Sequence, residues 1–164
     1  MPLTESQQRL LGNLASWCSV CERCTADVEA RLRKSDIDAA AAATIIERLK
    51  AENFVNDERY ARAFVRDKAA LQGWGPMKIR QHLAQKHIDS GTITEALAAY
   101  GDTAFDESLR EFLVHRSAQL RSVDPRQRTQ KLLRAALSRG FGYDESLRIL
   151  RRIGTDDDAD TYNI

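Results

Sequence analysis

The chain has 164 residues, of which 43% are hydrophobic and 30% are charged, a balance that permits a buried core in a soluble protein. No apolar run approaches the roughly 18 residues that a membrane span requires, and the first residues lack the basic and apolar regions of a secretion signal. There are three cysteines, an odd number that argues against a disulfide framework. We therefore expect a cytoplasmic protein with reduced thiols and no membrane segment.

The formal net charge of +1 is unevenly distributed along the chain. Residues 110–153 contain eleven basic and four acidic residues, whereas residues 154–164 contain four aspartates and no basic residue. The basic block predicts attraction to a polyanion or to an acidic groove of a protein, with the acidic segment as a local competitor. The alternative interpretation is that these charges only solvate the outer faces of helices.

One apolar pattern occurs three times in the chain. It is centred on Ile37, Ile88 and Phe141, which are 51 and 53 residues apart. In each copy, residues nine and five positions before the centre and eight, nine and twelve positions after it are almost all apolar. That spacing fits one face of each of two helices joined by a short turn. Its repetition predicts tandem helical units.

The turns between the paired helices carry local signals. Asp38, Asp89 and Asp144 follow the three central residues. They are predicted N-caps, because a short carboxylate accepts hydrogen bonds from the free amides of a first helical turn. Gly140 suits the left-handed backbone that often ends a helix.

A further helix is predicted before each pair, over residues 5–20, from residue 56 or 57 to about 72, and over residues 106–120. In the second of these helices, Tyr60, Phe64 and Leu71 are expected to face inward. Acidic pairs at the predicted starts of the second and third helices complement the helix dipole. Pro76 and Pro125 are each expected at the first position of the helix that follows, where a missing amide hydrogen costs nothing.

The predicted fold is all-α, with three tandem three-helix repeats that pack side by side into an elongated, curved array, because a unit of about 50 residues has a thin core. The predicted divisions are three repeats followed by a flexible acidic tail, over residues 1–54, 55–104, 105–153 and 154–164. We expect a monomer.

No catalytic constellation is recognisable in the sequence, and we expect neither an enzyme nor a cofactor. The cysteines form a CxxCxxC pattern, but a closed metal or iron–sulfur site usually needs a fourth ligand, and no fourth cysteine exists. We interpret Cys18, Cys21 and Cys24 as scattered thiols. The histidines, at positions 82, 87 and 115, show no metal-ligand spacing.

Basic residues recur on the second helix of each predicted repeat, as Arg31, Arg33 and Lys34 in the first, and are the better candidates for function. Such a stripe suits phosphates or an acidic protein groove. The candidate partner-binding residues of the second and third repeats are Lys78, Arg80, Lys86, Arg126, Arg128, Lys131, Arg134 and Arg139. Trp74 belongs to a Gly-Trp-Gly-Pro break and has two interpretations, an anchor for its own loop or an exposed anchor for a partner.

The run VNDERYARAFV at residues 55–65, followed by Gly73-x-Gly75-Pro76-x-x-Ile79-Arg80, closely resembles the central signature of the RecX family. The third repeat adds Lys131-Leu132-Leu133 and Leu137-Ser138-Arg139-Gly140-Phe141, which resemble the last repeat of that family. His87 stands where the family commonly has Gly before the apolar centre. We interpret the signature positions as architectural: Asp57, Arg59, Ala61, Gly75, Pro76 and Ile79.

The resemblance implies a non-enzymatic regulator that binds the filament of RecA recombinase on single-stranded DNA. It implies inhibition of filament extension, ATP hydrolysis and strand exchange, with no cofactor. Weak contact with single- or double-stranded DNA is a further expectation. The alternative function is a sequence-tolerant DNA-binding or transcription-regulatory helical module, since small three-helix units can present a helix to the major groove.

Overall fold

The computed structural model describes residues 2–162, with side chains as far as residue 154. All regular structure in this part of the chain is helical, which confirms the predicted all-α class. The helices are α1 (Glu5–Val20), α2 (Thr25–Arg33), α3 (Ala39–Ala51), α4 (Asp57–Arg66), α5 (Pro76–Gln85), α6 (Ser90–Tyr100), α7 (Asp102–Gln119), α8 (Pro125–Ser138) and α9 (Tyr143–Tyr162). A π-helical turn, Asp67–Leu71, extends α4.

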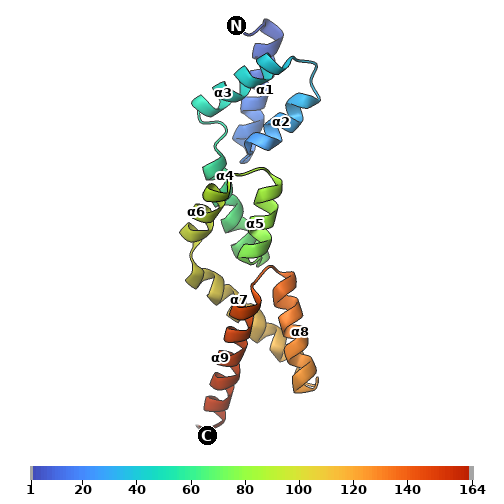
Figure 1. Cartoon of the computed structure of the whole chain (residues 1–164), viewed down its shortest axis with the longest axis vertical. Helices are drawn as coiled ribbons and strands as arrows, with labels where there is room; N and C mark the ends of the chain where they lie inside the picture. The colour runs from blue at the N-terminus through green and yellow to red at the C-terminus, as the bar shows by residue number, and fades with distance from the viewer. Residues whose placement is uncertain (1, 163–164) are drawn as a thin grey trace.

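Three groups of three helices follow one another along the long axis of the molecule (Figure 1). They are α1–α3, α4–α6 and α7–α9, called here the first, second and third units. Figure 1 shows the second helix of each unit, α2, α5 and α8, on one side of the array, and the third helices on the other. The two ends of the chain lie at opposite ends of the molecule. No helix in residues 2–162 combines the length and the apolar composition that crossing a membrane requires.

Short polar side chains begin several helices, as the sequence predicts. Asp38 accepts a 2.7 Å hydrogen bond from the amide of Ala41, and Asp89 accepts from two amides at the start of α6. Asn56 caps α4 by accepting from the amide of Arg59. The prediction for Asp144 is wrong, because α9 starts at Tyr143 and places this carboxylate within its first turn.

Two left-handed residues close the turns after α5 and α8. Gly140 has φ +95°, as predicted, and His87 adopts φ +57° at the equivalent position of the second unit. The amides of the following residues, Ile88 and Phe141, bond back to carbonyls near the ends of α5 and α8, at 3.2 and 3.1 Å. His87 therefore preserves the turn geometry, although a non-glycine residue is strained in this conformation.

The leading helices depart from the prediction in two places. The third-unit helix starts at Asp102 rather than at residue 106, because Gly101 ends α6 and starts α7 with no linker between them. Leu71 is 80% exposed instead of facing inward. The π-helical turn explains this, since its wider winding turns the following side chains away from the face set by α4 and buries Ala69 instead.

The segment predicted as a separate acidic tail from residue 154 is, as far as Tyr162, the last part of α9. The sequence signal was a change of composition, and a run of aspartates lowers helix propensity only modestly. The backbone therefore continues the helix that the preceding apolar residues start. Residues 163–164 lie outside the described part of the chain.

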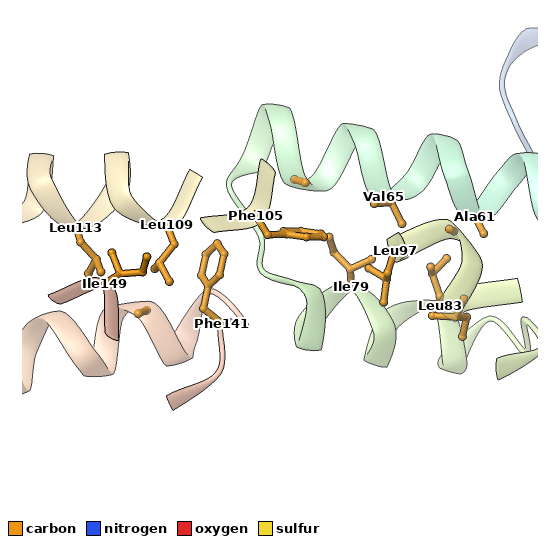
Figure 2. Close-up of a cluster of buried hydrophobic side chains, with 14 of the residues drawn as sticks. Ala61, Val65, Ile79, Leu83, Leu97, Phe105, Leu109, Leu113, Phe141 and Ile149 are labelled. Atoms are coloured by element: carbon orange, nitrogen blue, oxygen red, sulfur yellow. The ribbon is translucent and has the colours of Figure 1, made fainter. Parts of the chain in front are cut away.

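The described residues form two apolar cores. The first lies within the first unit and includes Leu14, Ile45 and Leu49. The second runs without interruption through the second and third units. Figure 2 shows Phe105 and Phe141 between the side chains of the second unit, such as Ile79, and those of the third. The second and third units therefore share one core. The first unit has a core of its own and contributes one buried side chain, Cys24, to the shared one.

Candidate partner-binding surface

The signature residues of the second unit form its contact with the first. The Asp57 carboxylate accepts 2.8 Å and 3.1 Å hydrogen bonds from the amide and hydroxyl of Thr25, at the start of α2. Arg59 forms a 2.6 Å ion pair with Glu22. The position of Asp57 at the start of α4 suggests that it caps this helix. Asn56 is the cap instead, because its side chain accepts the hydrogen bond from the amide of Arg59.

A third polar contact joins the same two units. The ammonium of Lys86, at the end of α5, lies 2.6 Å from a carboxylate oxygen of Asp27. Burial raises the pKa of Asp27, but hydrogen bonds from Lys86 and the Cys24 amide outweigh burial and leave the pKa below its usual value. The hydrogen bond to Asp27 raises the pKa of Lys86. We call these three contacts the first joint.

The second joint connects the second and third units through their backbones as well as through the shared core. The amide of Gly75 donates a 2.7 Å hydrogen bond to the carbonyl of Arg139, and the amide of Met77 donates a 2.9 Å bond to the carbonyl of Gly140. A Cβ atom at Gly75 would lie 2.5 Å from the amide nitrogen of Phe141. Only glycine allows this approach.

The other signature residues serve the scaffold. Pro76 is the first residue of α5, as predicted, and Ala61 and Ile79 are completely buried in the second core. The architectural role of the signature stays a prediction, and the burial of Ala61 and Ile79 is what that role requires.

Arg139, a candidate for partner contact, lies within the second joint. Its guanidinium donates a 3.2 Å hydrogen bond to the carbonyl of Gln72 and lies 4.2 Å from the centroid of the Phe112 ring. The side chain is half-buried. Its position serves the attachment of the third unit to the second.

Arg128 and Arg80 also make internal hydrogen bonds. Arg128 donates to the carbonyls of Arg121 and Val123, at 3.0 and 2.9 Å, and so closes the loop between α7 and α8. Arg80 is exposed and donates a 3.2 Å bond to the hydroxyl of Thr94. Arg128 is consequently less available for a partner than its sequence position suggests.

Trp74 is half-buried among aromatic and basic side chains. Its ring centroid lies 4.6 Å from that of His82 and 6.3 Å from that of Phe64. The ammonium groups of Lys68 and Lys78 lie 4.8 and 4.3 Å from the Trp74 centroid. These contacts are those of a loop anchor, and the side chain remains partly exposed.

Three candidate residues stay free of such contacts. Arg126, Lys131 and Arg134 are exposed along α8 and form no ion pair or side-chain hydrogen bond within the described residues. Their charges are available to an external anion. Within the stripe expected from the sequence, the set on α8 is unpaired, Lys78 and Arg80 make local contacts, and Lys86, Arg128 and Arg139 make internal contacts. That these residues bind a partner stays a prediction.

The cysteines lie at the end of α1 and the start of α2. Cys18 and Cys24 are buried and Cys21 is exposed. Burial raises the pKa of the Cys24 thiol to about 11 and raises that of Cys18 as well. No cluster of possible metal ligands occurs among the described residues.

Sequence reasoning missed the residues of the first unit that complete the first joint. Thr25, Glu22 and Asp27 lie 32 or more positions from their partners. No local periodicity connects residues so far apart, and only covariation between them would reveal the contacts.

The chain is similar to several proteins of one family. Residues 56–97 match a family model described as RecX, second three-helix domain. A regulatory protein RecX from Oceanobacillus iheyensis is 30% identical over 135 residues, which are 82% of this chain and 49% of that protein. The regulatory protein RecX of Bacillus subtilis is 30% identical over 145 residues, 85% of this chain and 53% of that protein. The chain spans about half the length of these curated relatives.

A solved structure agrees with the sequence matches. The crystal structure of RecX from Lactobacillus salivarius superposes with a TM-score of 0.86 at 25% identity. The alignment covers 93% of this chain and 99% of that one. The helical array therefore has the same arrangement as that of a solved RecX structure.

Proposed function

This chain belongs to the RecX family, and we propose that it is a non-enzymatic regulator of the RecA recombinase. In this proposal it binds along the filament of RecA on single-stranded DNA, in the cytoplasm and as a monomer. Binding inhibits filament extension, ATP hydrolysis and strand exchange. The match of the second three-helix unit to the family model carries the proposal.

The architecture supports a partner that is itself repetitive. Three similar units succeed one another along one axis, with their second helices on one side (Figure 1). A filament repeats its subunits along an axis, so several weak contacts form together. Multipoint binding of this kind increases affinity without any single strong site.

The unpaired charges of α8 are the proposed point of contact in the third unit. Arg126, Lys131 and Arg134 are exposed and have no ionic partner within the described residues. An acidic or phosphate surface can therefore bind to these residues without breaking an ion pair inside the protein. Lys78, Arg80 and Trp74 offer a smaller contact in the second unit.

Titration into a RecA–single-stranded DNA ATPase assay tests this function. We expect inhibition at concentrations well below that of the RecA monomer. A large molar excess that left ATP hydrolysis and strand exchange unchanged would refute the proposal.

A charge-reversal pair tests the surface. Lys131→Glu with Arg134→Glu should weaken inhibition roughly tenfold while leaving helicity and melting temperature nearly unchanged. The matched control is Arg62→Glu with Arg66→Glu, exposed positions on α4 that carry the same change of charge. If both pairs of substitutions weakened inhibition equally, the net charge of the protein and not the α8 surface would explain the effect.

A further inference from the structure

A cleft of about 630 Å³ lies between the first and second units, beside the first joint. Its charged lining consists of four basic and two acidic side chains, and Trp17 and Tyr60 contribute aromatic walls. The charged residues are Arg23, Arg31, Lys34, Lys86, Glu22 and Asp27. Arg31 and Lys34 belong to the basic stripe that the sequence predicts for the first unit, whereas Arg23 was not predicted.

Both acidic groups of the cleft are already paired. Glu22 bonds to Arg59 and Asp27 bonds to Lys86, each at 2.6 Å. The unpaired charge of the cleft is therefore positive. It lies on Arg23, Arg31 and Lys34, which form no ion pair within the described residues.

Trp17 fixes two of these cations in place. The guanidinium carbons of Arg23 and Arg31 lie 4.3 and 4.4 Å from the centroid of the Trp17 ring. A guanidinium that contacts a ring through its face keeps its N–H groups free at its edges. Two like charges beside one ring repel each other, and an anion placed between them would remove that repulsion.

The cleft also contains unsatisfied hydrogen-bonding atoms. Nε of Arg23 is buried without a hydrogen-bond partner, as is the second carboxylate oxygen of Glu22. A buried donor without an acceptor is costly, which leaves the Arg23 guanidinium incompletely satisfied inside the protein. The Glu22 oxygen would repel an anion in direct contact and so restricts it to the Arg31 and Lys34 side.

A similar arrangement of two cations and one ring occurs in the second unit and, in part, in the third, where Arg139 is also bonded to Gln72 within the second joint. Lys68 and Lys78 flank Trp74 in the second unit, and Arg116 and Arg139 lie over Phe112 in the third. In every unit one of the two cations comes from the second helix or its end, and Figure 1 shows these helices on one side of the array. Cations combined with aromatic rings are typical of surfaces for single-stranded nucleic acids, where phosphates bind the cations and bases contact the rings.

We propose that the cleft between the first and second units binds a backbone phosphate of a single-stranded nucleic acid. Arg31 donates hydrogen bonds to the phosphate oxygens, Arg23 and Lys34 add charge, and Trp17 holds the two guanidinium groups. The recurrence of paired cations beside a tryptophan in the second unit favours a strand with repeated phosphates over an acidic peptide. The inference deepens the proposed function, since the filament contains such a strand, but its test needs no recombinase.

Tryptophan fluorescence provides a local readout, because the chain has only two tryptophans. In the Trp74→Phe variant, emission reports on Trp17 alone. Titration with an oligothymidylate should change that emission saturably, and raised salt should reverse the change. Binding of the oligonucleotide, measured by anisotropy, with unchanged Trp17 emission would overturn the inference.

A matched pair of variants on α2 tests the contact itself. Arg31→Glu should weaken oligothymidylate binding roughly tenfold. Arg33→Glu carries the same change of charge on the same helix, but Arg33 lines the groove between α2 and α3 instead. It should weaken binding less than about twofold. Equal losses in both variants would show general charge attraction and overturn the assigned site.

Two further outcomes separate this inference from the proposed function. The milder Arg31→Gln variant should lower the slope of binding against salt by about one. If Arg31→Glu reduces inhibition of RecA but leaves oligonucleotide binding unchanged, the cleft contacts an acidic protein surface and the inference fails. If the oligonucleotide binds as expected while RecA remains uninhibited, the phosphate site stands and the proposed function fails.

Discussion

The first joint connects its units through side-chain hydrogen bonds, ion pairs and one buried thiol, Cys24, whereas the second joint connects its units through an extensive shared apolar core and backbone hydrogen bonds. Ion pairs that water reaches contribute only about 0–1 kcal/mol each. Burial of apolar surface contributes roughly 25 cal/mol per Å² and depends little on ionic strength. We infer that the second and third units unfold together, while the first unit separates more easily.

The difference matters for binding along a filament. A joint held by a few polar contacts allows one unit to reorient at low cost, whereas a joint filled with aromatic side chains fixes the angle between its units. The proposed phosphate cleft lies at the adjustable joint. The unpaired cations of α8 lie on the rigid half of the array.

The largest expected loss of stability comes from removing an aromatic side chain from the second joint. Phe141→Ala should reduce the free energy of unfolding by about 3–5 kcal/mol, because it removes a buried ring from the core that two units share. Hydrogen exchange should show lower protection in both α5 and α7. Leu14→Ala is the control, since its effect should remain within the separate core of the first unit. Loss of protection in only one unit after Phe141→Ala would contradict a shared core.

A smaller loss of stability is expected when an added side chain pushes apart the two backbone segments that meet at the second joint. Gly75→Ala should cost roughly 1–3 kcal/mol, because its Cβ would collide with the backbone at Gly140 and Phe141. Gly12→Ala is the control, since a Cβ there meets no atom within 4 Å. That substitution should be neutral or stabilise α1 by up to about 1 kcal/mol. Thermal unfolding of both variants measures the difference.

At the first joint, Asp57→Ala should cost about 1 kcal/mol, because the amide and hydroxyl of Thr25 lose their acceptor. Hydrogen exchange should increase in α2 and remain unchanged in α7 and α8. Glu58→Ala removes the same charge from the same helical turn without touching Thr25, and it should leave α2 protected. Increased exchange across all three units would mean that the first joint is as cooperative as the second.

The smallest effect is a pH dependence confined to the first joint. The lowered pKa of Asp27 means that the folded chain holds this carboxylate ionised more strongly than the unfolded chain. Its stabilisation is therefore present above the unfolded pKa and is lost as pH falls through the folded pKa. Near neutral pH, Asp27→Asn should reduce the free energy of unfolding by less than about 1 kcal/mol and so lower the melting temperature slightly. In acid, the melting temperatures of the variant and the natural chain should differ less. If the melting temperatures of the two proteins differed by the same amount at every pH, the ionised carboxylate of Asp27 would not be the cause.

Much of the fold was predictable because its signals are local. The helical spacing around Ile37, Ile88 and Phe141, the caps Asp38 and Asp89 and the left-handed Gly140 all depend on residues a few positions apart. The errors arise where a neighbour overrides the local pattern. The π-helical turn after α4 rotates Leu71 outward, and Gly101 joins two helices that the pattern separated.

The candidate site was less predictable. Its basic residues were found from charge alone, and charge does not distinguish an arginine that solvates a helix from one that holds a joint. Arg139 contacts Phe112 and Gln72, while Lys131 on the same helix remains unpaired. That distinction depends on side chains many residues away.

The sequence by itself determined the helical class, the three units, the family and the positions of the signature residues, because periodicity, caps and motifs are read along the chain. Only the tertiary structure decided what those residues do. Asp57 and Gly75 are 18 positions apart, yet the first bonds to the unit before its own and the second to the unit after it. The physical reason is that helix formation depends on neighbours within about one turn, whereas a joint depends on which surfaces the packed core brings together.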